Sequence, residues 1–120
     1  MTQIIENALT IDVEDYFQVA ALAEAVRRED WHSMEYRVEA NTQRILGLLS
    51  RHNARATFFT LGWVAEKSPE LVRAIQKEGH EIASHGYSHQ LVYNQTPEVF
   101  REETRRSKAI LEDITGEPIT

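Results

Sequence analysis

Short apolar runs alternate with longer segments of helical period along this sequence, and this alternation is the feature that most limits the possible fold. The strand-like runs are residues 8–11, 56–61 and 80–84. Each is followed by a stretch in which apolar residues recur every three to four positions, as in a helix that buries one face. Strands that alternate with helices favour parallel pairing through crossover helices, so the sequence predicts an α/β fold.

Cap residues indicate where the later helices begin and end. Ser68 and Thr96 each precede a proline, a pairing typical of an N-cap followed by the first helical position. Gly79 and Gly116 suit the exits of the same two helices. An earlier helix is predicted from residue 34 to about residue 50, with an apolar face made of Val38, Ile45, Leu48 and Leu49.

Composition excludes several classes of protein. At 120 residues the chain is long enough for one small domain and too short for two. The formal charge of −6 argues against nucleic-acid binding, which needs a basic face. Because cysteine is absent, any metal must be held by His, Asp or Glu. The sequence shows no secretory signal and no apolar run of the ~20 residues that cross a bilayer, so we expect a cytoplasmic protein without a membrane span.

An acidic cluster, Asp12-Val13-Glu14-Asp15, follows the first predicted strand. Three carboxylates within four residues repel one another, and partial burial would increase the cost. A cation would offset that cost, and carboxylate oxygens suit zinc, manganese or similar ions. A solvated acidic turn or a helix N-cap is the alternative interpretation of this cluster.

Two histidines, His85 and His89, follow the third predicted strand. Histidines four positions apart can face one point on a helical turn, as in other His-x-x-x-His metal sites. Gly86 favours a tight loop or a single turn over a longer helix. A surface loop with two neutral histidines is the alternative interpretation.

Both clusters come at the carboxyl ends of predicted parallel strands, where active sites gather in α/β folds. We therefore expect them at one edge of the same sheet. Two imidazoles and one carboxylate form a three-ligand set that leaves coordination positions for water and substrate. A further carboxylate is then free to act as a base, and together the clusters predict metal-assisted hydrolysis.

Three segments carry a resemblance to a known family. They are Leu-Thr-Ile-Asp at residues 9–12, Ala-Thr-Phe-Phe-Thr-Leu-Gly at residues 56–62, and Gly-His-Glu-Ile-Ala-Ser-His-Gly-Tyr-Ser-His at residues 79–89. The sequence resembles the NodB-type polysaccharide deacetylases, carbohydrate esterase family four. The run Asp-Val-Glu-Asp-Tyr-Phe at residues 12–17 is similar to the branch associated with bacterial exopolysaccharide and exosortase loci.

The resemblance implies a distorted (β/α) barrel, a divalent metal, and hydrolysis of N-acetyl groups on an amino-sugar polysaccharide or oligosaccharide. Zn²⁺ is the expected metal, with Co²⁺, Mn²⁺ or Ni²⁺ as alternatives. By the same resemblance, His85 and His89 match the two metal-binding histidines. Asp12 matches the general base that activates the attacking water.

One departure from the family pattern leaves the third metal ligand open. The family has two adjacent aspartates, of which the second binds metal, but Val13 occupies that place here. Strand alternation would put Glu14 on the same face as Asp12, whereas a turn at the strand end could present Asp15. Some relatives space the base and the ligand by one residue as this chain does, which favours Glu14.

The second departure is length. The family's later motifs are not found in this sequence, so residues 1–120 are expected to be the N-terminal part of a longer deacetylase domain. Open strand edges would then favour self-association, and these residues alone would have weak activity or none. The alternative functions are a related amide hydrolase acting on a cyclic ureide and a non-catalytic carbohydrate-binding domain.

Overall fold

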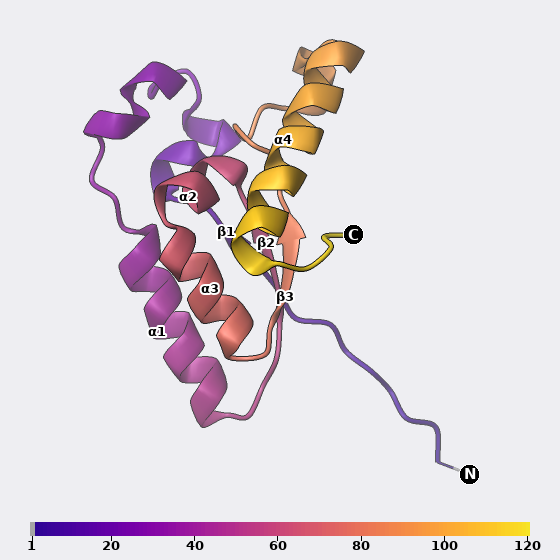
Figure 1. The fold of residues 1–120 in the computed structure, drawn as a ribbon. Helices are drawn as coiled ribbons and strands as arrows, with labels where there is room; N and C mark the ends of the chain where they lie inside the picture. Colours follow the sequence, from indigo (N-terminus) through magenta and orange to yellow (C-terminus); the bar gives the residue numbers. More distant parts are fainter. Residues whose placement is uncertain (1) are drawn as a thin grey trace.

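The computed structural model describes residues 2–120. It contains a three-stranded parallel sheet in the order β1 (Thr10–Val13), β2 (Thr57–Thr60) and β3 (Glu81–Ser84). The α-helices are α1 (Val38–Arg51), α2 (Gly62–Lys67), α3 (Pro69–Lys77) and α4 (Pro97–Thr115) (Figure 1). Helices connect successive parallel strands, so the predicted α/β class with crossover helices is confirmed.

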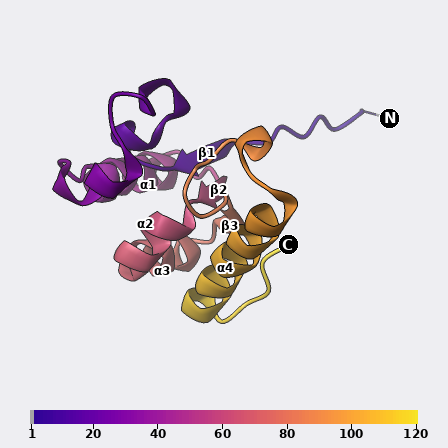
Figure 2. The ribbon, with the colours of Figure 1, turned by 90° about the horizontal axis from the view of Figure 1, so that it is seen from above.

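The two faces of the sheet differ. Ile11, Phe58 and Ile82 are register partners across the strands, and the last two are buried. The helices gather on one side of the sheet (Figure 2). Phe58 and Ile82 share one hydrophobic core with residues of these helices, and Ile11 packs against it. Because side chains alternate along a strand, Asp12 and its register partner Phe59 project from the opposite face.

The hydrophobic core lies between the sheet and its helices. Leu71, Val72 and Ile75 form the predicted apolar stripe of α3, and all of them are buried. Leu111 of α4 joins the same cluster and is fully buried. Removing such side chains from water stabilises the fold by about 1.5–3 kcal/mol each, which fixes the helices against the strands.

The predicted helix ends are confirmed at both α3 and α4, but only α4 has a side-chain capping bond at its start. The hydroxyl of Thr96 accepts a hydrogen bond from the Val99 amide, and Gly116 ends α4 in the left-handed conformation with φ 71°. Ser68 stands at the N-cap position of α3 but makes no capping bond. Its hydroxyl donates instead to Glu39 of α1 over 2.6 Å, so it joins two helices.

The first strand lies two residues later than predicted, at Thr10–Val13 rather than residues 8–11. Val13 is buried and pairs with Thr60, so the strand continues into the acidic cluster. Asp12 therefore lies inside the strand. Of the three carboxylates in the acidic cluster, only those of Glu14 and Asp15 come after the strand.

The first helix also begins later than predicted, at Val38 rather than at residue 34. Its buried face consists of Val38, Thr42, Leu46 and Leu49. The placement of Leu48 on that face was wrong, since this side chain is 47% exposed. Helix α2 was not predicted, because six residues are too few to show a helical period.

Between β1 and α1 the chain forms three short 3-10 helices, η1 (Tyr16–Gln18), η2 (Ala20–Leu22) and η3 (Arg28–Ser33). A fourth, η4 (Val92–Asn94), precedes α4. Within residues 2–120, β1 and β3 each pair along one edge, and no helix is long and apolar enough to cross a membrane. The expected self-association and cytoplasmic location remain predictions.

Candidate active site

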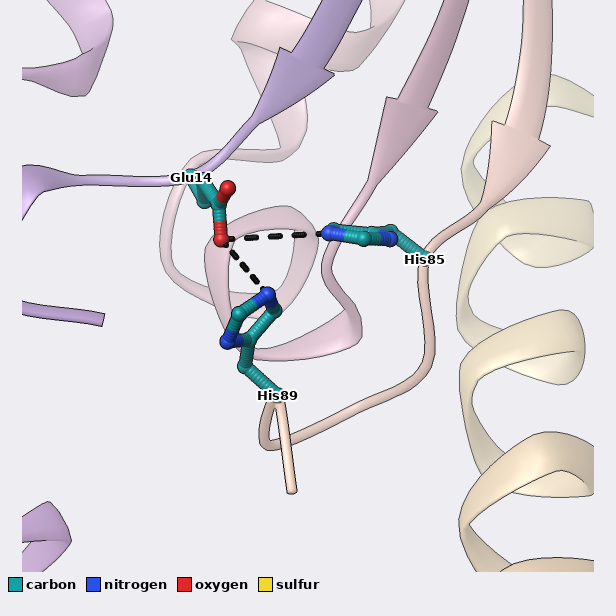
Figure 3. A group of neighbouring side chains, drawn as sticks. All are labelled: Glu14, His85 and His89. Carbon is teal, nitrogen blue, oxygen red and sulfur yellow. Dashed lines mark ion pairs between the residues drawn. The ribbon is translucent and has the colours of Figure 1, made fainter. Parts of the chain in front are cut away.

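Glu14, His85 and His89 come together at the carboxyl ends of the strands (Figure 3). Glu14 is the first residue after β1, and His85 is the first residue after β3. The Oε2 atom of Glu14 lies 3.0 Å from Nε2 of His89 and 3.8 Å from Nε2 of His85. The structure therefore brings the two predicted clusters to one edge of the sheet.

The donor atoms of this group fit a bound cation. Oε2 of Glu14 and Nε2 of His85 are buried and have no hydrogen-bond partner. Leaving such atoms unpaired is costly, and a cation between them would remove that cost. One ligand atom from each of the three residues lies within 4.8 Å of the others, and two histidines with one glutamate are a donor set of catalytic zinc sites.

Asp12 lies beside this group on its solvent side. Its Oδ2 atom is 3.7 Å from Nε2 of His85, and its side chain is 52% exposed. The Glu14 side chain is only 17% exposed. The structure thus separates the two carboxylates into one that faces the histidines and one that solvent can reach.

Asp15 is directed away from the histidines. Its buried carboxylate accepts hydrogen bonds from the backbone amides of Tyr16, Arg37 and Val38, at 2.9, 2.6 and 2.8 Å. Two of these amides belong to the start of α1, where the helix itself offers them no partner. Of the two predicted sources of a third ligand, the structure brings Glu14 into the group and uses Asp15 as an anchor for α1.

The N-cap interpretation of the acidic cluster is confirmed for Asp15, and the local sequence carries a signal for it. Asp15 and Gln18 form a capping box, in which the Asp15 amide donates to the Gln18 side chain over 2.7 Å. Acidic or hydroxyl residues followed three positions later by Glu or Gln are typical of such a box. The pattern identifies Asp15 as a cap, although the bonds to α1 are long-range and leave no local signal.

The segment that carries the histidines is a loop, as Gly86 suggests, and other elements hold its backbone. The Gly86 carbonyl accepts from the Gly62 amide over 2.8 Å and from the Ser107 hydroxyl over 3.1 Å. The next carbonyl, of Tyr87, accepts from the Trp63 amide over 3.1 Å. The amino end of α2 is therefore a support for the histidine loop.

Gly62 permits this close approach. A Cβ atom at Gly62 would lie 2.6 Å from the Tyr87 ring and 3.3 Å from the Cα of Ser107. In the sequence, Gly62 directly follows the predicted strand of residues 56–61. The structure shows that it also allows α2, α4 and the histidine loop to meet.

Comparison with known proteins identifies the family. The sequence profile named polysaccharide deacetylase matches residues 29–120. The chain belongs to this family. It is 40% identical over 75 residues to a peptidoglycan-N-acetylglucosamine deacetylase of Bacillus cereus, covering 62% of this chain and 27% of that protein. It is also 39% identical over 70 residues to a chitooligosaccharide deacetylase of a Bradyrhizobium species, covering 58% of this chain and 32% of that protein.

Solved structures of the family have the same arrangement of elements. The peptidoglycan deacetylase PdaC of Bacillus subtilis superimposes with a TM-score of 0.71 at 26% identity, covering 94% of this chain and 45% of that chain. The likeness confirms the expected fold as part of the (β/α) barrel of carbohydrate esterase family 4. This polysaccharide deacetylase chain thus spans about a quarter of the Bacillus cereus relative and less than half of PdaC.

Proposed function

We propose that the protein hydrolyses N-acetyl groups on an amino-sugar polymer with the help of a divalent metal. In this proposal the chain supplies three metal ligands and the general base. The observation that carries it is the convergence of Glu14, His85 and His89 beside Asp12. Membership of the family, and similarity to deacetylases of peptidoglycan and chitooligosaccharides, support the class of substrate.

The proposed metal ligands are His85, His89 and Glu14. Asp15 is not proposed as a ligand, because both of its carboxylate oxygens accept backbone hydrogen bonds. Imidazole and carboxylate donors suit Zn²⁺ best, and they also accept Co²⁺, Mn²⁺ or Ni²⁺. Such an ion, when bound, supplies Lewis acidity toward an acetamide carbonyl and makes a water molecule more acidic.

Asp12 is proposed as the general base. Its half-exposed carboxylate lies next to the ligand group, where it can accept a proton from a water that attacks the acetyl carbon. Attack, delivery of a proton to the leaving nitrogen and cleavage of the carbon–nitrogen bond release acetate and leave a free amine on the sugar. Burial of Glu14 toward the histidines leaves Asp12 as the carboxylate of this pair that water can reach.

Substitution of a single metal ligand or of the base in the complete gene product tests the proposal. We expect Asp12→Asn to keep its metal and to lose about 10²–10⁴-fold in turnover, the usual contribution of a general base. His89→Ala is expected to lose both metal and turnover. Metal content and acetate release from N-acetylated glycans are the measurements, with the exposed Asp113→Asn as the matched control.

The same assay separates the alternatives. Unchanged metal content in His89→Ala would show that His89 is not a metal ligand. Full turnover in Asp12→Asn would show that Asp12 is not the general base. Ring opening of allantoin-like compounds without acetate release would indicate a cyclic ureide hydrolase. Glycan binding without any turnover would indicate a non-catalytic domain. Because residues 12–17 resemble the exopolysaccharide-associated branch, an acetylated exopolysaccharide belongs among the substrates tested.

A further inference from the structure

His89 has an unusual backbone conformation. Its φ angle is +55°, in the left-handed region that residues with a side chain rarely occupy. This conformation directs the imidazole toward Glu14, with Nε2 at 3.0 Å from the carboxylate oxygen (Figure 3). A strained conformation persists only where the surrounding structure holds it. The contacts on either side of His89 therefore decide where this imidazole lies.

The residue before His89 is held from two sides. The Ser88 hydroxyl donates to Oε1 of Glu103, on α4, over 2.6 Å. The Ser88 carbonyl accepts from Nε of Arg28, on η3, over 2.9 Å. These bonds come from elements 60 and 15 positions away in the sequence, so they tie the histidine loop to the rest of the fold.

The residue after His89 is linked to the same carboxylate. The side-chain amide of Gln95 donates to Oε2 of Glu103 over 3.1 Å and to the Gln90 carbonyl over 3.2 Å. Both oxygens of Glu103 are thus used, one toward Ser88 and the other toward Gln95. Glu103 is partly buried, which strengthens these bonds relative to bonds in open water.

We propose that Glu103 is a positioning residue for His89. By holding Ser88 directly and Gln90 through Gln95, its carboxylate fixes the chain on both sides of the left-handed residue. The proposal rests on the metal site proposed above, because the hydrogen bonds of Glu103 would orient the His89 imidazole toward the cation bound there. Partners of this kind, which orient a ligand without touching the metal, typically contribute 10–100-fold to metal affinity.

The test compares Glu103→Ala with Glu102→Ala in the complete gene product. Glu102 is the neighbouring carboxylate on α4 and is exposed, so it controls for the loss of charge. We expect Glu103→Ala to bind Zn²⁺ about tenfold more weakly in a chelator competition, and to alter the visible spectrum of bound Co²⁺. Glu102→Ala should change neither. Glu103→Gln should recover most of the affinity, since its amide oxygen can still accept from Ser88.

A second measurement does not depend on metal. In the metal-free protein with labelled histidine, a nuclear Overhauser contact between the His89 ring and Glu14 should be present in the wild type and in Glu102→Ala, and lost in Glu103→Ala. Should Glu103→Ala not fold, Ser88→Ala replaces it, because that change deletes only the hydroxyl.

The outcomes separate the two proposals. A wild type that binds no Zn²⁺ refutes the metal site, while loss of the Overhauser contact in Glu103→Ala would still support the positioning of His89 by Glu103. Retention of that contact together with wild-type Zn²⁺ affinity in Glu103→Ala would overturn the positioning role.

Discussion

The two polar segments that form the site are fixed in different ways. The segment after β1 carries its own anchor, since Asp15 accepts three backbone hydrogen bonds and two of them come from α1. The segment after β3 depends mainly on groups supplied by other elements, namely Gly62, Ser107, Glu103 and Arg28. One segment is held by a single internal carboxylate, and the other by several distant contacts.

This difference determines which properties a substitution changes. Glu14 and Asp15 are adjacent in the sequence, yet Glu14 has an oxygen that faces the histidines without a hydrogen bond, whereas Asp15 accepts bonds from backbone amides. Stability and metal binding should therefore be separable after β1. After β3 the same contacts hold the loop and orient its two histidines, so we expect stability and metal binding to change together.

The largest effect is expected at Asp15. Asp15→Ala leaves buried backbone amides without their charged acceptor, so we expect the free energy of unfolding to fall by about 3 kcal/mol. Glu14→Ala should cost less than about 1 kcal/mol in metal-free protein, because it removes a buried oxygen that accepts no hydrogen bond, but should abolish metal binding. Urea unfolding with metal titration measures both, and equal losses of stability in the two variants would contradict the comparison.

A smaller loss is expected at Gly62. Gly62→Ala places a Cβ against the Tyr87 ring, so we expect a loss of about 2 kcal/mol together with weaker metal binding. A Cβ added at Gly47 in α1 would meet no atom within 4 Å, so Gly47→Ala should instead raise stability by about 0.5–1 kcal/mol. Thermal unfolding and metal titration provide the comparison. Unaltered metal affinity in a destabilised Gly62→Ala would show that the loop does not couple the two properties.

The smallest effect is expected at alkaline pH and concerns Tyr36, which directly precedes the Arg37 amide that donates to Asp15. Burial raises the pKa of the Tyr36 phenol from 10.0 to about 12, although its hydrogen bond with Ser68 lowers it. The fold thus favours the neutral phenol, a contribution fully present below pH 10 and lost as the pH rises toward about 12. Because the ring is partly exposed, we expect this loss of stability to be smaller than the losses in Asp15→Ala and Gly62→Ala. Urea unfolding between pH 9 and pH 12 should show the decline, and Tyr36→Phe should flatten it; an identical decline in that variant would assign it to another group.

Much of the fold follows from local patterns. The apolar stripe of Leu71, Val72 and Ile75, and the cap at Thr96, depend on neighbours within a few positions, and both are present as predicted. The end of β1 was wrong because Val13 is drawn into the strand by pairing with Thr60, a partner 47 positions away. Pairing of that kind has no local signature, so strand ends are less predictable than helix caps.

The sequence by itself determined the chemistry available to this protein: carboxylates and imidazoles at two strand ends, with no thiolate to compete. It could not decide which of Glu14 and Asp15 faces the histidines, because both orientations are open to a chain leaving a strand. Only the tertiary structure decided, since the amides at the start of α1 needed an acceptor and Asp15 supplies it. Once Asp15 is held there, Glu14 is left to face His85 and His89.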